Sequence, residues 1–143
     1  MEYSKYKSVY VALIFVFGLP LLSITNDFWD GAPVLYGFRI NDLSGIKLTY
    51  FESGWYLQYY FYQFIHTLSN NFGINEEIIL KLITLLSVIG ISIEVKRLSI
   101  YLFDIPENMS YVAAYCVLLF PAWFVLVSNA LFIHVLCIYL LLF

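Results

Sequence analysis

The segment from Ile78 to Val95 constrains this chain most, because it is a run of about 18 mostly apolar residues. A helix needs roughly 20 such residues to cross the hydrocarbon core of a bilayer. Lys81, one turn into the run, has a stem long enough to reach back to the membrane surface. Lys96 and Arg97 follow directly, and basic residues at the end of a span are typical of the cytoplasmic side. The run therefore predicts a membrane-spanning helix whose carboxyl end lies inside the cell.

The overall composition agrees with a membrane protein. Hydrophobic residues make up 62% of the 143 residues and charged residues only 12%, whereas soluble domains are about 25% charged. The mean hydropathy is +0.84. The net charge of −3 leaves no basic surface of the kind that binds nucleic acid, so nucleic acid is excluded as a partner. We predict an all-α integral membrane protein, a polytopic helical bundle that has membrane lipid as a partner.

Three further apolar runs are predicted to span the membrane, at about residues 9–25, 111–128 and 131–143. Lys5 and Lys7 precede the first run and place the amino terminus inside. No small-x-small cleavage site ends that run, which favours an uncleaved helix over the alternative, a signal peptide. The last run is shorter than a full span. We therefore expect residues 1–143 to be the amino-terminal part of one longer transmembrane domain.

Residues 26–77 are expected to form a long outer loop that contains interfacial helices. The loop carries six acids against two basic residues, and this acidic balance suits the outer side. Pro33 is tolerated at the first turn of a short helix over Val34–Ile40, and residues 41–45 indicate a turn. A short amphipathic piece is expected at Ile46–Phe51.

The segment Trp55–Leu68 predicts an amphipathic helix with an aromatic-rich polar side. Its apolar stripe consists of Leu57, Phe61, Phe64, Leu68 and Phe72. At about 14 residues the segment is short for a span, so we expect it to lie in the outer membrane interface. The alternative is a second span, which would move Lys96 and Arg97 outside, against the positive-inside rule. With the interfacial placement, residues 98–110 become a cytoplasmic loop.

Asp27 and Asp30 are the first candidates for chemistry, because they follow the first predicted span with Phe28 and Trp29 between them. A carboxylate partly desolvated beside a membrane has a raised pKa and a raised basicity, and is able to take a proton from an acceptor hydroxyl. Two carboxylates at this spacing could also hold a divalent cation. The simpler interpretation is that they only cap short helices.

Other polar residues carry weaker signals. Glu52 is a further acid that could face the same cleft, or could simply favour the positive end of a helix. Arg39 and Lys47 could pair with a lipid phosphate. His66 is expected to hydrogen-bond on a polar helix face, and His134 to pack near a helix end.

Several classes of site are excluded. The sequence has no Ser/His/Asp order, no phosphate-cradling glycine loop and no zinc spacing. Its two cysteines, Cys116 and Cys137, both lie in apolar runs without a CxxC pattern. We therefore expect them to pack as small hydrophobic residues.

Taken in order, these features resemble the amino-terminal part of a GT-C superfamily glycosyltransferase. These multi-span enzymes use polyprenyl-phosphate-linked sugars. The resemblance rests on Asn26-Asp27-Phe28-Trp29-Asp30 directly after the first span, on Phe51-Glu52-Ser53-Gly54-Trp55 in a long outer loop, and on the aromatic run Trp55–Tyr60. Phe120-Pro121 in the third predicted span also agrees. Bacterial members that build O-antigen and other surface polysaccharides are the most similar.

The resemblance implies an enzyme of the bacterial inner (cytoplasmic) membrane that transfers a sugar from the polyprenyl-phosphate donor to a glycan or lipid-linked acceptor on the outer face, usually with inversion. A first-loop aspartate would be the general base, with Asp30 the first choice and Asp27 the second. No metal or other cofactor is expected, although a divalent cation is possible. The residues expected to bind substrate are Glu52, Arg39, Trp55 and Gln58.

The chain departs from many GT-C members at one position. These members carry a further acid near the outer end of the third span, where this chain has Asn129, and this departure counts against a two-carboxylate or metal-assisted mechanism.

Two alternative functions stay open. A polysaccharide polymerase or ligase would rely on arginines in a large outer loop, and this loop has only Arg39. A non-catalytic small membrane protein for transport or assembly is favoured if 143 residues are the whole chain, because so few spans can hardly enclose a donor and an acceptor.

Overall fold

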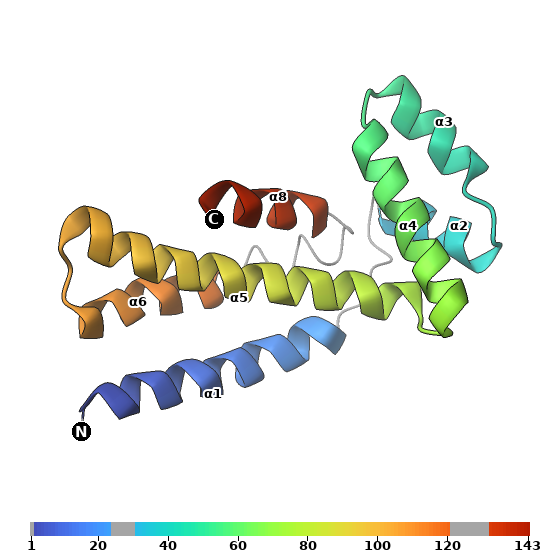
Figure 1. Cartoon of the computed structure of the whole chain (residues 1–143). Coiled ribbons are helices and arrows are strands. Elements are labelled where there is room, and N and C mark those ends of the chain that lie inside the picture. Colours follow the sequence, from blue (N-terminus) through green and yellow to red (C-terminus); the bar gives the residue numbers. More distant parts are fainter. Residues whose placement is uncertain (1, 24–30, 121–131) are drawn as a thin grey trace.

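The structure is a computed structural model of the chain, and it describes residues 2–23, 31–120 and 132–143. Within these ranges every regular element is an α-helix, so the predicted all-α class is confirmed (Figure 1). The helices are α1 (Glu2–Ser23), α2 (Gly31–Arg39), α3 (Ser44–Glu52), α4 (Tyr56–Phe72), α5 (Glu76–Phe103), α6 (Glu107–Leu118) and α8 (Phe132–Leu142).

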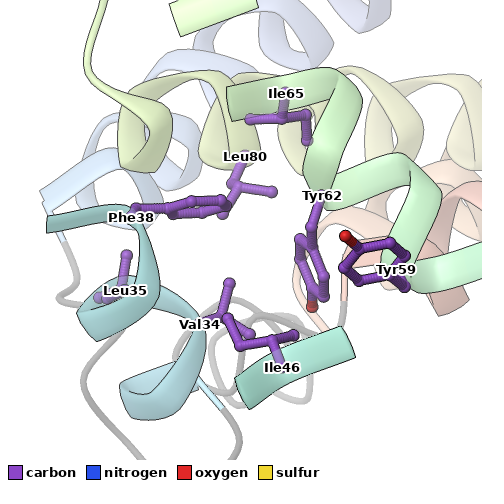
Figure 2. Packing of buried hydrophobic residues seen from close by; sticks show 8 residues of the cluster. All are labelled: Val34, Leu35, Phe38, Ile46, Tyr59, Tyr62, Ile65 and Leu80. Atoms are coloured by element: carbon purple, nitrogen blue, oxygen red, sulfur yellow. The ribbon is translucent and has the colours of Figure 1, made fainter. Parts of the chain in front are cut away.

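The described helices form two regions. Helices α1, α5, α6 and α8 lie along one another and are called the bundle below, whereas α4 runs across the amino-terminal end of α5 and α3 packs against α4 (Figure 1). Helices α2, α3 and α4 are called the cap. The cap has its own core, to which α5 contributes one residue (Figure 2). This cap core consists of Val34, Leu35, Phe38, Ile46, Tyr59, Tyr62, Ile65 and Leu80.

The chain turns from the cap into α5 over Gly73, Ile74 and Asn75. Gly73 ends α4 with φ of 66°, a left-handed conformation that glycine adopts without strain. Asn75 then caps α5, because its side-chain oxygen accepts a hydrogen bond from the backbone N–H of Glu77 over 2.8 Å. Glu76 and Glu77 occupy the first turn, where negative charge favours the positive end of a helix. The sequence thus fixes the corner at which the cap meets the bundle.

Helix α5 is the longest element. At 28 residues it is, among the described residues, the one helix long and apolar enough to cross a membrane; α1 contains a shorter apolar stretch, Tyr6–Val16. One such helix does not by itself establish a membrane location. The predicted loop over residues 98–110 is wrong at both ends, because α5 continues to Phe103 and α6 begins at Glu107, which leaves only Asp104, Ile105 and Pro106 between them. The stretch after Arg97 contains no glycine or proline, and the helix ends only at Asp104, which has φ of 50° and precedes Pro106 by two positions.

Helix α6 returns along α5 after this short turn and ends earlier than expected. The run 111–128 predicts one continuous helix, but α6 ends at Leu118. Pro121 supplies the reason, because a proline ring clashes with the backbone of a helix that continues into it. Residues 121–128 of that predicted span lie outside the described residues.

The bundle is held by contacts that α5 makes with all three of its neighbours. The bundle core consists of Val88, Ile91, Leu118 and Val135. At Gly90 the ring of Tyr139 packs so closely that an added Cβ would lie 2.4 Å from it. Tyr10 of α1 hydrogen-bonds to Ser92 of α5, and the Tyr115 hydroxyl of α6 donates to the backbone carbonyl of Tyr6 over 2.8 Å. These contacts place α1, α6 and α8 around α5.

Candidate functional site

A cavity of about 310 Å³ opens beside α3. We call it the α3 cavity. Its aromatic walls are Tyr50 and Trp55, and hydroxyl groups come from Thr49, Tyr50 and Ser53. Pro33, from the first turn of α2, also lines it. The volume lies at the lower end of the range for small-ligand sites, and the wall is mainly apolar with a few hydroxyl groups, as such sites usually are.

A second cavity, of about 420 Å³, lies between the amino-terminal end of α4 and helix α8. We call it the α8 cavity. Most of its wall is aliphatic or aromatic, from Trp55, Leu57, Ile138 and Leu141. Gln58 supplies an amide, and Cys137 supplies a thiol. This wall suits an apolar chain better than a polar molecule.

Trp55 lines both cavities. Its ring centroid lies 6.1 Å from that of Tyr50, and Tyr50 packs edge-on against Tyr62 in the cap core at 5.7 Å. The Trp55 side chain is 48% exposed, so one part of the ring is held by the protein while the rest is accessible to a ligand. The residue therefore lines two mainly apolar cavities, of which the α3 cavity carries hydroxyl groups and the α8 cavity carries an amide and a thiol.

Gln58 is fixed by the tyrosines behind it. Its side chain is buried, and its Nε2 donates to the Tyr62 hydroxyl over 3.0 Å and lies 3.5 Å from the Tyr50 hydroxyl. A buried amide with a bonded donor keeps a fixed orientation. Of the four residues expected to bind substrate, the structure therefore brings Trp55 and Gln58 together at the α8 cavity.

The other two lie elsewhere. Arg39 lines a separate small cavity of about 90 Å³, together with Asn75, Glu76 and Glu77 at the start of α5. Glu52 is exposed at the last residue of α3, and it is not among the residues that line the α3 or the α8 cavity. Glu52 is thus close to Trp55 in the sequence, but its carboxylate does not line either cavity.

His66 joins three segments of the cap to α5, a role that the sequence did not reveal. Its Nδ1 lies 2.9 Å from Glu76 Oε1 at the start of α5, and its Nε2 lies 2.6 Å from Asn41 Oδ1 in the α2–α3 turn. The imidazole also stacks on Phe38, with ring centroids 5.6 Å apart. The expected hydrogen bonding of His66 is confirmed, but its partners, 25 and 10 residues away, carry no sequence signal that pairs them.

The turn beside His66 is tightened by Asp42. The backbone N–H of Ser44 donates to Asp42 Oδ1 over 2.8 Å, and this bond lowers the pKa of the Asp42 carboxyl. The group is fully exposed, so it acts as a local turn contact and not as part of either cavity.

The two candidate bases, Asp27 and Asp30, lie outside the described residues, as do Asn129 and the side chain of His134. Pro33, which lines the α3 cavity, follows Asp30 by three positions in the sequence. Among the residues that the structure describes, no group of three or more His, Cys, Asp or Glu side chains is placed to hold a metal ion. The described walls of the two cavities therefore consist of aromatic, hydroxyl, amide, thiol and aliphatic groups.

Comparison with protein-family models, with curated proteins and with solved structures finds no match to this chain.

Proposed function

We propose that this chain is the amino-terminal part of a multi-span membrane glycosyltransferase that transfers a sugar from a polyprenyl-phosphate donor to a glycan or lipid-linked acceptor. The cap would lie on the outer face of a bacterial inner membrane and the bundle in the bilayer. The observation that carries the proposal is the position of Trp55 on the walls of two mainly apolar cavities, one of which includes hydroxyl groups while the other does not.

The α3 cavity supports the sugar end of this substrate. A sugar ring presents hydroxyls around its edge and apolar C–H groups on its faces. The Thr49 hydroxyl donates to the Gly45 carbonyl over 3.2 Å and keeps lone pairs that can accept a hydrogen bond. Ser53 offers a second hydroxyl, and Trp55 offers an aromatic face. Its volume of about 310 Å³ lies at the lower end of the range for small-ligand sites.

The α8 cavity supports the lipid end. A polyprenyl chain is a branched hydrocarbon, and Leu57, Ile138 and Leu141 give it an aliphatic wall. Each buried methylene of such a chain contributes about 0.8 kcal/mol, so even a short segment would be held. Trp55, on both walls, would mark the junction at which the phosphate and sugar leave the hydrocarbon.

The surface of α5 supports the placement of the bundle in lipid. Its buried face carries small hydroxyl residues, among them Thr84 and Ser92, while Leu82 and Leu86 point outward and are 42% and 65% exposed. Small residues between helices and large aliphatic residues on the outside are the pattern of packing in a bilayer. In water the same arrangement would expose a long apolar stripe to solvent.

Asp30 is proposed as the general base, with Asp27 as the second candidate. At most about 11 Å of extended chain separates Asp30 from Pro33, which lines the α3 cavity. A carboxylate tethered this close could reach an acceptor hydroxyl beside a bound sugar. A general base contributes about 10²–10⁴-fold to a rate.

A binding test uses the two native cysteines. Cys137 lines the α8 cavity, whereas Cys116, on α6, is not among the residues of its wall, and both are exposed. A polyprenyl phosphate should slow alkylation of Cys137 by a maleimide at least tenfold and leave Cys116 unchanged, whereas a short-chain phosphate should protect neither. Equal protection of both cysteines, or of neither, by the polyprenyl phosphate would contradict the lipid site.

The activity test uses membranes that contain the product of the natural gene and a labelled polyprenyl-phosphate sugar. Asp30→Asn is expected to lower sugar transfer at least 100-fold, and Trp55→Ala at least tenfold through a raised KM for the donor. Tyr101→Ala, at an 83% exposed position near the end of α5, is the matched control with unchanged activity. Full activity in both Asp30→Asn and Asp27→Asn would refute the mechanism.

A further inference from the structure

Helix α4 leaves its most apolar stripe uncovered. Leu57, Phe64 and Phe72 are 71%, 55% and 71% exposed, and Phe61 and Leu68 of the same stripe are half-buried. The side of α4 that packs into the cap is instead made of Gln58, Tyr59, Tyr62, Ile65 and Ser69. The helix therefore buries tyrosines and an amide inside the cap, while its phenylalanine and leucine side chains face outward.

The uncovered stripe has no charge near it along the chain. Between Ser53 and Asn75 there is no Asp, Glu, Lys or Arg. The polar residues beside the stripe, Gln63 and Thr67, are uncharged and exposed. A surface without charge gains nothing from an acidic or basic protein partner, and it loses little when it enters a region of low dielectric.

The position of α4 indicates what covers the stripe. Only Gly73, Ile74 and Asn75 separate α4 from α5, and α4 runs across the end of α5 (Figure 1). If α5 spans the bilayer, its first turn lies at the membrane surface, and a helix that crosses this end lies roughly in the plane of that surface. Aromatic residues with an apolar body and a polar edge, such as Tyr56 and Tyr60 on the exposed side of α4, settle at this depth.

We infer that α4 is embedded in the outer lipid interface through the stripe Leu57, Phe61, Phe64, Leu68 and Phe72, and that this insertion requires no anionic headgroup. Interfacial helices bind through buried apolar area and through attraction between basic residues and anionic lipid. Each basic residue near an anionic surface strengthens that attraction. Since α4 has none, the apolar term alone holds it, and phosphatidylcholine serves as well as an anionic lipid. The inference rests on the membrane placement proposed above, but not on the transferase activity.

The test measures the environment of single cysteines in the full chain, in nanodiscs, after Cys116 and Cys137 are replaced by alanine. A nitroxide attached at each new cysteine reports its collisions with oxygen, which concentrates in lipid, and with a water-soluble nickel chelate. Phe64→Cys is paired with Gln63→Cys, its neighbour on the polar side. Phe72→Cys and Thr67→Cys form a second pair, so that failure of one variant to fold does not end the test.

Labels at positions 64 and 72 are expected to favour oxygen over nickel at least fivefold more than labels at 63 and 67. The ratios should agree within a factor of two between phosphatidylcholine discs and discs that contain half phosphatidylglycerol. Nickel access at both sides of α4 would overturn the inference, and so would a low collision rate with both reagents at 64, which indicates a protein partner. Insertion only with phosphatidylglycerol would overturn it as well.

Leu86→Cys on α5 separates this result from the broader proposal. Leu86 is 65% exposed on the membrane-length helix, so its label should favour oxygen if α5 spans the bilayer. Oxygen access at 86 with nickel access at 64 would reject the inference about α4 and keep the membrane placement. Nickel access at both positions would reject the two together.

Discussion

The cap and the α5 helix of the bundle bury different kinds of polar side chain. The cap buries large side chains, with Tyr62 and Ile65 no more than 1% exposed, and pairs its buried amide Gln58 with tyrosine hydroxyls. The α5 helix of the bundle buries small hydroxyl residues, each bonded to a carbonyl of its own helix, as Thr84 is to Leu80 over 3.0 Å. The same buried face also carries Leu80, Val88 and Ile91, while Leu82 and Leu86 are exposed. The cap thus centres on aromatic rings and an amide, whereas α5 buries small hydroxyl residues beside aliphatic ones, a combination also found between helices that pack in a bilayer.

The contrast predicts that a cavity in the cap core unfolds the cap alone. Tyr62→Ala removes a ring that packs against Phe38 and Tyr50 and leaves the Gln58 amide without its partner. We expect a loss of about 3–5 kcal/mol, measured as faster amide hydrogen exchange in α2–α4 of the protein in detergent micelles. Exchange in α5 beyond its second turn should change little. Leu86→Ala, at an outward position of α5, is the control and should alter neither region. Equal loss of protection in the cap and throughout α5 would show that the two regions are one cooperative unit.

The close contact between α5 and α8 predicts an effect confined to the bundle. In Gly90→Ala, the new methyl group would meet the Tyr139 ring, and overpacking of this kind costs about 1–3 kcal/mol. Helix α8 should loosen, and alkylation of Cys137 should accelerate while exchange in the cap stays unchanged. Combining Gly90→Ala with Tyr139→Ala should restore much of the loss, because the clash disappears. If Gly90→Ala leaves Cys137 unaffected, the close packing at Gly90 is not what holds α8.

The boundary between the regions depends on His66. In His66→Ala the hydrogen bonds to Asn41 and Glu76 and the stack on Phe38 are lost together, and we expect the cap to lose about 1–2 kcal/mol. Hydrogen exchange of the α2–α3 turn and of the first turn of α5 should increase first. Thr67→Ala, on the adjacent exposed position of α4, is the control with little effect. An equal effect of the two substitutions would mean that His66 does not join the cap to α5.

Local signals in the sequence were enough to predict the helices, but they did not predict which distant residues come into contact. The proline at position 33, the turn residues around Asp42 and the 3.6-residue periodicity of α4 act within a few residues, so the short helices of the predicted outer loop appear where expected. The basic pair Lys96 and Arg97 predicts too short a helix, because both residues are good helix formers and α5 continues through them to Phe103. A basic pair therefore does not by itself end a helix.

The site shows the same division. Trp55 and Gln58 were expected from a short motif and do line one cavity, but nothing local indicates that Ile138 and Leu141 form its opposite wall. Arg39 belongs to the same predicted loop, yet it ends α2 and lines a separate small cavity at the start of α5. Their position in the predicted outer loop therefore identified the candidate residues, but only the packing of α3 and α8 around Trp55 shows which candidates line a cavity.

The smallest expected effect concerns the exposed turn between α2 and α3. Asp42 is fully exposed, and the bond from the Ser44 N–H lowers its pKa in the folded state. Because the folded pKa is below the unfolded value of about 3.9, the charged form contributes stability above that pH, and the contribution disappears as the pH falls through the folded pKa. Asp42→Asn keeps an oxygen acceptor but cannot titrate, so its cap stability should fall less than that of the wild type between pH 6 and pH 3. Thermal unfolding of the cap in detergent at the two pH values measures the difference, and an identical pH dependence in both proteins would show that the Asp42–Ser44 bond does not stabilise the turn.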